Sequence, residues 1–275
     1  MQGLGNDFII LDDQHSGSNS LEKIVNAEFS RKICDRRYGV GADQILWLRK
    51  PHAAGPDCRM EIWNADGSTA EMCGNGIRAV AFYLHDHGPK PKLHSYSIET
   101  PAGLNEVKIK GGNHGHPRSV AVDMGKPGLG ALVASGGETL EVGKSFLKFY
   151  EVSMGNPHAV IFVDDVAKVP VESIGPIIEK HPRFPKRTNV EFVQVEDASN
   201  IHVRVWERGA GVTLACGTGA CAAAVASIVA EKTDSSLNVK LPGGSLHIHW
   251  ARGEAPVMME GPASEVFRGE YHWEQ

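Results

Sequence analysis

The chain has 275 residues, 41% of them apolar, so it can bury a substantial core and form one or two domains. Its formal net charge of −5 predicts no general attraction to nucleic acid or to acidic membranes. No stretch approaches the roughly 18 apolar residues of a membrane helix. The start, Met1 to Asn6, does not resemble a secretion signal, and the five cysteines are an odd number. We therefore expect a soluble cytoplasmic protein with free thiols and no nucleic-acid or membrane partner.

The apolar pattern predicts many strands and two strongly apolar helices. One helix follows Cys73 and includes residues 77–84, and the other follows Cys216 and covers residues 220–230. Further helices are expected over 21–36 and 174–181. Many strands around one apolar helix per half favour an α+β fold over a parallel doubly wound sheet. The expected strands are 8–12, 44–48, 59–64, 95–100, 104–110, 119–124, 146–154, 160–163, 189–195, 201–206, 237–241, 245–250 and 257–260.

Two Cys-Gly-x-Gly motifs, Cys73 to Gly76 and Cys216 to Gly219, mark an internal repeat. A tryptophan, Trp63 or Trp206, lies ten residues before each cysteine, so the whole block recurs with an offset of 143 residues and no gap. Weaker echoes at nearly the same offset are Gly5-Asn6 with Gly155-Asn156 and Thr100-Pro101-Ala102-Gly103 with Leu241-Pro242-Gly243-Gly244. We therefore expect a duplicated domain with a pseudo-twofold axis. The Gly- and His-rich segment 111–117 is the expected boundary, which gives halves 1–117 and 118–261.

The paired cysteines are candidates for two acid–base groups. A helix N-terminus lowers the pKa of a thiol and leaves backbone N–H groups open to an anion. One thiolate and one thiol on opposite faces of a substrate can remove a proton from carbon and return one from the other side. The amides of Gly74, Asn75, Gly217 and Thr218 can bind a carboxylate and stabilise the charge that develops. The remaining cysteines, Cys34, Cys58 and Cys221, are interpreted as small core residues.

Polar residues in turns near the motifs are candidate substrate ligands. The adjacent Glu207 and Arg208 can bind the ammonium and the carboxylate of an amino acid. His158 can tune a thiol, although a single histidine is more often an ordinary hydrogen-bonded residue. We expect no metal site, because His247 and His249 lack a third ligand, and no pyridoxal-phosphate motif is present. The other candidates are amides, which are common in turns for structural reasons: Asn6, Gln44, Asn64, Asn156 and Asn189.

The chain resembles the diaminopimelate epimerase family nearly from end to end. In the first half the resemblance rests on Gly3-Leu4-Gly5-Asn6-Asp7-Phe8, Gly41-Ala42-Asp43-Gln44, Asn64-Ala65-Asp66-Gly67-Ser68 and Met72-Cys73-Gly74-Asn75-Gly76. In the second half it rests on Ser153-Met154-Gly155-Asn156-Pro157-His158, Arg187-Thr188-Asn189, Glu207-Arg208-Gly209-Ala210-Gly211 and Ala215-Cys216-Gly217-Thr218-Gly219-Ala220.

The resemblance implies a cofactor-independent enzyme that interconverts LL- and meso-diaminopimelate, in the synthesis of lysine and peptidoglycan precursors, with Cys73 and Cys216 as its bases. The candidate amides and polar side chains would hold the substrate, and His158 and Glu207 would tune the thiols. Each half would be a barrel-like, mostly antiparallel sheet around a central helix, with the C-terminal strand, about residues 262–275, returning to the first half. A homodimer is expected, and Phe267 stands where the family can carry a tyrosine linked to the dimer contact.

Three other functions remain open on the residues alone. A proline or hydroxyproline racemase shares the paired-cysteine logic but needs no site for a distal amino acid, which Asn64, Asn189 and Arg208 would provide. A cysteine hydrolase or acyltransferase would use one thiol as nucleophile and would not need the second cysteine. A non-catalytic amino-acid-binding protein would tolerate serine at both positions.

Overall fold

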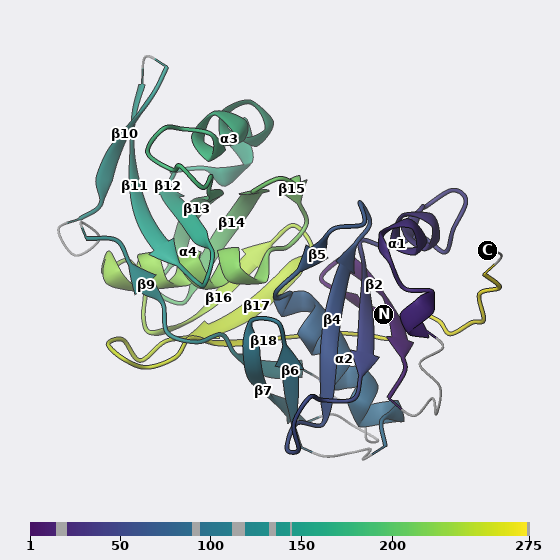
Figure 1. Ribbon diagram of the computed structural model, residues 1–275. Coiled ribbons are helices and arrows are strands. Elements are labelled where there is room, and N and C mark those ends of the chain that lie inside the picture. The colour runs from purple at the N-terminus through teal and green to yellow at the C-terminus, as the bar shows by residue number, and fades with distance from the viewer. Residues whose placement is uncertain (15–20, 90–93, 112–118, 132–135, 144, 274–275) are drawn as a thin grey trace. The chain divides into compact units, whose positions relative to one another are not determined.

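A computed structural model describes residues 1–14, 21–89, 94–111, 119–131, 136–143 and 145–273 (Figure 1). The chain divides into two units, unit 1 with residues 1–122 and 261–275 and unit 2 with residues 123–260. Most of the expected boundary segment, residues 112–117, lies outside the described residues. Within the described ranges, none of the helices combines the length and apolar character needed to cross a membrane.

Unit 1 is a mixed sheet that surrounds helix α2. Strands β2 and β3 are parallel, β3 and β4 are antiparallel, and β4 is parallel to β6. The hairpin of β6 and β7 continues antiparallel into β8. The elements are β1 (Gln2–Gly3), β2 (Asn6–Asp12), the 3-10 helix η1 (Leu21–Lys23), α1 (Ala27–Cys34), β3 (Gln44–Arg49), β4 (Cys58–Asn64), β5 (Thr69–Ala70), α2 (Gly74–His87), β6 (Ser95–Thr100), β7 (Gly103–Lys110) and β8 (Ser119–Asp123).

Unit 2 repeats this order around helix α4. Strands β12 and β13 are parallel, β13 and β14 are antiparallel, and β14 is parallel to β16. The hairpin of β16 and β17 continues into β18. The elements are β9 (Gly128–Leu129), β10 (Glu138–Val142), β11 (Ser145–Ser153), β12 (Pro157–Phe162), the 3-10 helix η3 (Val166–Lys168), α3 (Val171–Glu179), β13 (Asn189–Asp197), β14 (Asn200–Glu207), β15 (Gly211–Thr213), α4 (Gly217–Val229), β16 (Ser236–Leu241), β17 (Gly244–His249) and β18 (Met258–Gly261).

The predicted repeat is present in the strand register. Trp63 of β4 pairs with Thr69 of β5, and Trp206 of β14 pairs with Val212 of β15. Each of these short hairpins leads directly into a cysteine and then a helix, α2 or α4. The α+β class is therefore confirmed, with equivalent elements in the two units.

The two central helices differ in the residues that they bury. Helix α4 is rich in alanine, and every position from Gly217 to Val229 except Thr218 and Val229 is buried, so strands approach it closely from several sides (Figure 1). It packs against β11 to β14, β16 and β17. Helix α2 carries Arg78, which is fully buried and donates hydrogen bonds to the Gly74 carbonyl at 3.1 Å and to Asn75 Oδ1 at 2.9 Å. A buried guanidinium thus braces the first turn of α2.

The C-terminal residues 261–275 belong to unit 1. Gly261 ends β18, and residues 262–273 form one bridge, in which Gln2 and Ser264 exchange backbone hydrogen bonds at 2.9 and 3.0 Å. Trp273 packs edge-on against Phe29, with ring centroids 4.9 Å apart. The segment therefore follows unit 1 without forming the strand that the resemblance implied.

Other local predictions need correction. The expected helix over 21–36 is broken, because η1 ends at Lys23 and Asn26 caps a new helix, α1, by accepting from the amides of Glu28 and Phe29 at 2.9 and 3.0 Å. Strands β1, β5, β9 and β15 escaped prediction because two or three residues show no periodicity. Strand β10 escaped because only Leu140 in it is buried.

We predict that Asn26→Ala lowers the free energy of unfolding by about 1 kcal/mol, because it removes the N-cap of α1. Urea titration followed by circular dichroism measures the change. Asn26→Asp keeps an acceptor and should retain most of the stability. Equal losses in the two variants would contradict the capping role.

Candidate active site

Cys73 is the N-cap residue of α2. Its backbone is extended, with φ −140° and ψ 107°, and its Sγ accepts from the Gly76 amide at 3.3 Å. A Cβ at Gly76 would lie 3.0 Å from Leu46 Cδ2, so a larger residue would push this turn away from the sheet. The glycine thus allows a helix to begin in a buried place with its first amides beside a half-buried sulfur.

Asn6 connects strand β2 to the Cys73 turn. Its Nδ2 donates to Asp43 Oδ2 at 2.7 Å. Its Oδ1 lies 3.9 Å from Cys73 Sγ and accepts from Asn75 Nδ2 at 3.5 Å. The structure therefore brings Asn6 and Asn75 together at the thiol.

Gln44 and Asn64 lie side by side on paired strands. Gln44 of β3 is opposite Asn64 of β4, and its Nε2 donates to Asn64 Oδ1 at 2.8 Å. Asn64 Nδ2 donates in turn to Ser68 Oγ at 2.9 Å. Gln44 Oε1 is buried and has no hydrogen-bond partner among the described residues. It is therefore an acceptor that a ligand's N–H group can satisfy.

Cys216 caps α4 in the same manner as Cys73 caps α2. Its Sγ accepts from the Gly219 amide at 3.3 Å and lies 3.5 Å from Thr218 Oγ1. Burial raises the pKa of this thiol well above its ordinary value, and the carboxylates of Glu207 and Glu191 add to the effect. The hydrogen bonds from Thr218 and Gly219 oppose it. The prediction of a lowered pKa is therefore wrong for Cys216, because desolvation and two carboxylates outweigh the helix end.

Glu207 ends β14 beside Cys216. Burial raises the pKa of its carboxyl group, whereas hydrogen bonds from Thr213 and from the Cys216 thiol lower it. The hydroxyl of Thr213 donates to Glu207 Oε1. Glu207 and Cys216 thus influence each other's ionisation.

His158 lies beneath this region, fully buried on β12. Its Nδ1 is 2.7 Å from Glu191 Oε1, and its Nε2 is 3.0 Å from Asn156 Oδ1. Asn156 Nδ2 donates to Thr218 Oγ1 at 3.3 Å. His158 therefore reaches Cys216 through Asn156 and Thr218. Sequence reasoning missed Glu191, although a carboxylate inside the apolar run of β13 was a signal for it.

Asn189 and Arg208 are joined through the backbone. Asn189 Oδ1 accepts from the Arg208 amide at 2.9 Å, and Asn189 Nδ2 donates to the Pro157 carbonyl at 3.0 Å. The guanidinium of Arg208 donates to the Lys186 carbonyl at 3.3 Å. Both ends of the Asn189 amide are therefore engaged with loops, while the charge of Arg208 has no carboxylate partner among the described ion pairs.

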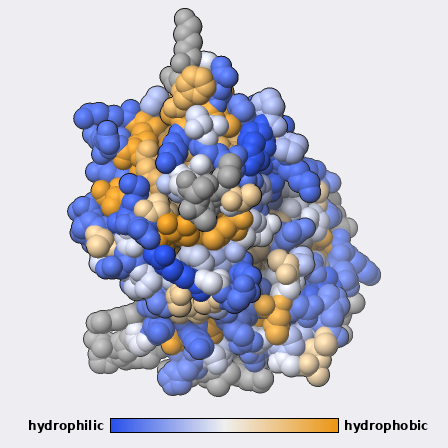
Figure 2. Space-filling model, turned by 90° about the vertical axis from the view of Figure 1, so that its left-hand side faces the viewer, coloured by the Kyte–Doolittle hydropathy of each residue, from blue (hydrophilic) through white to orange (hydrophobic). Residues whose placement is uncertain are grey.

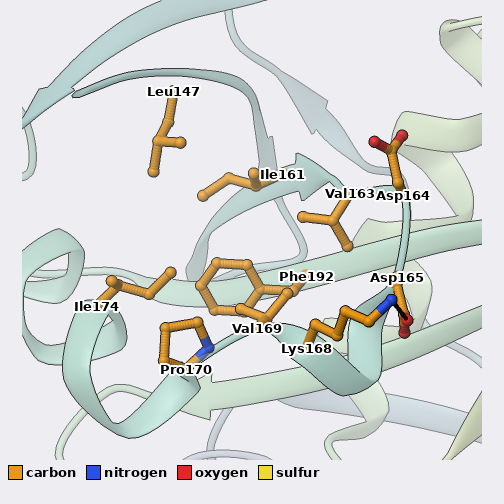
Figure 3. A pocket seen from close by; sticks show the side chains of 10 residues that line it. All are labelled: Leu147, Ile161, Val163, Asp164, Asp165, Lys168, Val169, Pro170, Ile174 and Phe192. Carbon is orange, nitrogen blue, oxygen red and sulfur yellow. Dashed lines mark ion pairs between the residues drawn. The ribbon is translucent and has the colours of Figure 1, made fainter.

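A separate cavity of about 450 Å³ lies on the other face of the sheet in unit 2 (Figure 3). Its floor is apolar, and Asp165 and Lys168 form an ion pair of 3.0 Å at its edge (Figure 3). Side chains alternate along a strand, so Ile161 and Phe192 point into this cavity while His158 and Glu191 belong to the α4 face. The cavity contains none of the candidate residues.

The remaining cysteines are all buried, and burial raises the pKa of Cys34 to about 11. No cluster of three or more metal-binding side chains was found in the part of the chain that the structure describes. The face shown in Figure 2 is mostly hydrophilic, with apolar side chains gathered in limited patches.

The fold is shared with solved structures of low sequence identity. A phenazine biosynthesis protein of the PhzF family from Bacillus anthracis matches with a TM-score of 0.68 and 16% identity, over 95% of this chain and 91% of that chain. A hydroxyproline epimerase from Agrobacterium vitis matches with a TM-score of 0.65 and 17% identity, over 84% and 76% of the two chains. The protein thus has the pseudo-symmetric α+β fold of PhzF and proline racemase-like proteins, with a cysteine at the start of the central helix in each unit.

Sequence comparison then gives the family. The model described as diaminopimelate epimerase matches residues 1–129 and 150–266. A diaminopimelate epimerase from Leptospira biflexa is 44% identical over 98% of this chain and 96% of its own length. One from Carboxydothermus hydrogenoformans is 47% identical over 98% of this chain and 97% of its own length. The chain belongs to the diaminopimelate epimerase family, as the sequence motifs predicted.

We predict that Glu207→Gln lowers the pKa of Cys216, because it removes a negative charge that disfavours the thiolate. The rate of alkylation by iodoacetamide, followed by mass spectrometry in a Cys73→Ser background, should then rise at lower pH. Glu196→Gln changes an exposed carboxylate on β13 and is the matched control. If the pH midpoint of Cys216 alkylation were unchanged or higher in Glu207→Gln, the carboxylate of Glu207 would not be what raises the pKa of Cys216.

Proposed function

We propose that this protein interconverts LL-2,6-diaminopimelate and meso-2,6-diaminopimelate by two-base proton transfer at one α-carbon. The observation that carries the proposal is the matched pair of capped helices, in which Cys73 Sγ and Cys216 Sγ each accept from the third helical amide at 3.3 Å. The proposal requires both thiols to face the same substrate carbon from opposite sides. Family membership supports this substrate and this reaction.

The chemistry balances without a cofactor. A thiolate takes the α-proton, so the C–H bond breaks and its electron pair is delocalised into the substrate carboxylate. The opposite thiol then gives its proton to the other face of the carbon, which inverts the centre. The two cysteines finish with their protonation states exchanged, and solvent proton exchange must restore them. Because burial raises the pKa of Cys216, we assign the thiol role in the resting state to Cys216.

The helix ends supply electrostatic stabilisation. One early amide of each helix is directed at sulfur, and we propose that the amides of Gly74, Asn75, Gly217 and Thr218 bind the reacting carboxylate. An anion at a helix N-terminus gains about 0.3–2 kcal/mol. This gain grows as negative charge develops on the carboxylate, so it favours the transition state over the substrate.

The remaining candidates would hold the two amino-acid ends. The unpartnered Gln44 Oε1, next to Asn64, can accept from an ammonium group. Arg208 can exchange its bond with the Lys186 carbonyl for a carboxylate of the substrate. Asn189 would act by fixing the Arg208 backbone. Asn6, Asn156 and Glu207 would complete the site next to the thiols, with His158 tuning Cys216.

We predict that Cys73→Ala and Cys216→Ala each lower net epimerisation at least about 10²–10⁴-fold, because each removes one acid–base group. Enzyme is incubated with LL-diaminopimelate in deuterated water, and deuterium at the α-carbon and product stereochemistry are followed. Cys221→Ala, which changes a buried residue within α4, should keep near-native turnover. Near-native turnover in either active-site variant would exclude the two-base mechanism.

The same assay separates the alternatives. L-proline incubated in parallel should gain no deuterium, since Asn64, Asn189 and Arg208 would form a site for a second amino-acid end that proline lacks. Exchange into proline but not into diaminopimelate would establish the racemase instead. A hydrolase or acyltransferase would give no α-exchange and would tolerate loss of one cysteine.

We also propose a cytoplasmic homodimer. The five cysteines are an odd number, which fits a reducing compartment better than a disulfide scaffold. Val266 and Phe267 are 62% and 64% exposed next to one another, an unusual exposure for large apolar side chains.

We predict that Phe267→Glu converts the dimer to a monomer, because it places a charge in an apolar contact. Light scattering coupled to gel filtration measures the mass. Leu104→Glu changes a side chain of similar exposure elsewhere in unit 1 and should leave the mass unchanged. A wild-type monomer, or a Phe267→Glu dimer, would contradict the proposal.

A further inference from the structure

We propose that Glu191 is a positioning residue, which fixes the direction of a hydrogen-bond chain that runs through His158, Asn156 and Thr218 to the sulfur of Cys216. Its effect on turnover rests on the proposed function, whereas the chain itself is a property of unit 2. Every member lies in residues 123–260.

The chain is continuous and largely sealed from solvent. Glu191 and His158 are both 0% exposed, and Oε1 of Glu191 lies 2.7 Å from Nδ1 of His158. Nε2 of His158 lies 3.0 Å from Asn156 Oδ1, and Asn156 Nδ2 donates to Thr218 Oγ1 at 3.3 Å. Thr218 Oγ1 is 3.5 Å from the sulfur. No gap separates the core carboxylate from the catalytic thiol.

The acceptors in this chain determine where the protons lie. Both ring nitrogens of His158 face oxygen acceptors, Glu191 Oε1 and Asn156 Oδ1. Nε2 must therefore carry a proton, and a second proton must lie between Nδ1 and Oε1. The carboxylate makes this possible, because an imidazole holding two protons is buried only with a compensating negative charge.

This arrangement leaves the Thr218 hydroxyl free to donate to sulfur. Because Asn156 turns its oxygen toward His158, it turns its NH₂ group toward Thr218 Oγ1. The hydroxyl accepts that bond, so its own proton can point to Cys216 and stabilise the thiolate. If His158 lost the Nε2 proton, the Asn156 amide would turn over, and Thr218 would donate to Asn156 instead.

Unit 1 shows that packing of the sheet against the central helix does not require a histidine and a glutamate at these positions. Phe8 is paired with Gln44 as His158 is paired with Asn189, so Phe8 and His158 occupy equivalent positions. Leu46 is paired with Ile62 as Glu191 is paired with Val205.

A close approach to the helix supports the equivalence. A Cβ at Gly76 would lie 3.0 Å from Leu46 Cδ2, and one at Gly219 would lie 2.8 Å from Glu191 Oε1. An apolar Phe8 and Leu46 thus fill the place that His158 and Glu191 fill in unit 2. Glu191 Oε2 has no hydrogen-bond partner among the described residues, a cost that packing alone does not explain.

The first experiment observes the chain in the unmodified protein. Histidine labelled with ¹⁵N is examined by NMR at neutral pH, and the His158 signals are assigned with a His158→Asn variant. We expect a one-bond N–H coupling at Nε2 of His158. A bare Nε2 nitrogen would overturn the proposal, and this readout does not depend on the reaction.

The second experiment copies the apolar pair of unit 1 into unit 2. His158→Phe combined with Glu191→Leu should fold with unchanged or higher thermal stability, because well-packed apolar residues often replace a buried ion pair without loss. Its kcat should nevertheless fall about 10-fold or more, with a smaller change in KM. A folded double variant with native kcat would overturn the proposal.

The third experiment tests whether Glu191 acts through Thr218. Glu191→Gln keeps the size and the hydrogen bonding of the side chain. It lets His158 carry its single proton on either nitrogen, so the hydrogen bonds from His158 to Cys216 no longer have one fixed donor-to-acceptor direction. We expect kcat to fall about 10-fold in this variant and no further fall when it is added to Thr218→Val. Glu196→Gln on the same strand is the control and should keep native kcat. If the double variant lost kcat by the product of the two single losses, Glu191 would not act through Thr218, and the proposal would be overturned.

The outcomes separate this inference from the proposed function. A wild-type protein without α-exchange into diaminopimelate defeats the proposed function, and the NMR result still decides the hydrogen-bond chain. An active wild type with a bare Nε2, or with native kcat in the folded double variant, defeats the role of Glu191 alone.

Discussion

The site depends on the unsatisfied N–H groups at the start of two buried helices. The first amides of a helix have no intrahelical acceptor, and burial removes the water that would otherwise bind them. In α2 and α4 one such amide goes to the sulfur of the capping cysteine, at 3.3 Å in both. Sulfur accepts far better as thiolate than as thiol, so the same contact that completes the helix also favours the reactive ion. The burial of each helix and the ionisation of the cysteine at its N-terminus therefore depend on the same contact.

Duplication gives the two helices equal backbones but different surroundings. Asn6 and Asn156 lie two residues before the equivalent positions Phe8 and His158, and Asn64 of unit 1 corresponds to Glu207 of unit 2 at the end of β4 and β14. Cys73 is half-buried among neutral amides, whereas Cys216 is buried near two carboxylates. One backbone arrangement thus places two thiols in different surroundings, and those of Cys216 raise its pKa. This is what a reaction needs when one group must take a proton and the other must give it.

The sequence predicted the parts of this arrangement that are local in the chain. The equal ten-residue spacing of Trp63 to Cys73 and of Trp206 to Cys216 revealed the repeat, because the repeated hairpin and helix are contiguous in the sequence. The break at Asn26 and the two-residue strands were missed, because a cap and a single bridge leave no periodic pattern. Glu191 was missed for another reason. Its partner His158 is 33 residues away in sequence, and only the parallel pairing of β12 and β13 brings the two together.

Because its surroundings raise the pKa of Cys216, this cysteine needs nearby hydrogen-bond donors to become a thiolate. In the proposed two-base mechanism each turnover leaves the proton on the opposite cysteine, so Cys216 would have to be a thiolate in half of the cycle. Each unit by which the surroundings raise its pKa costs that state about 1.4 kcal/mol, or a tenfold lower population. Burial and the carboxylates of Glu207 and Glu191 raise it, and the Gly219 amide and the Thr218 hydroxyl lower it. A hydroxyl can contribute only if its proton is directed at sulfur. The buried pair behind Asn156 has the geometry to ensure this, so Glu191 opposes the thiolate by its charge and supports it by ordering the hydrogen bonds.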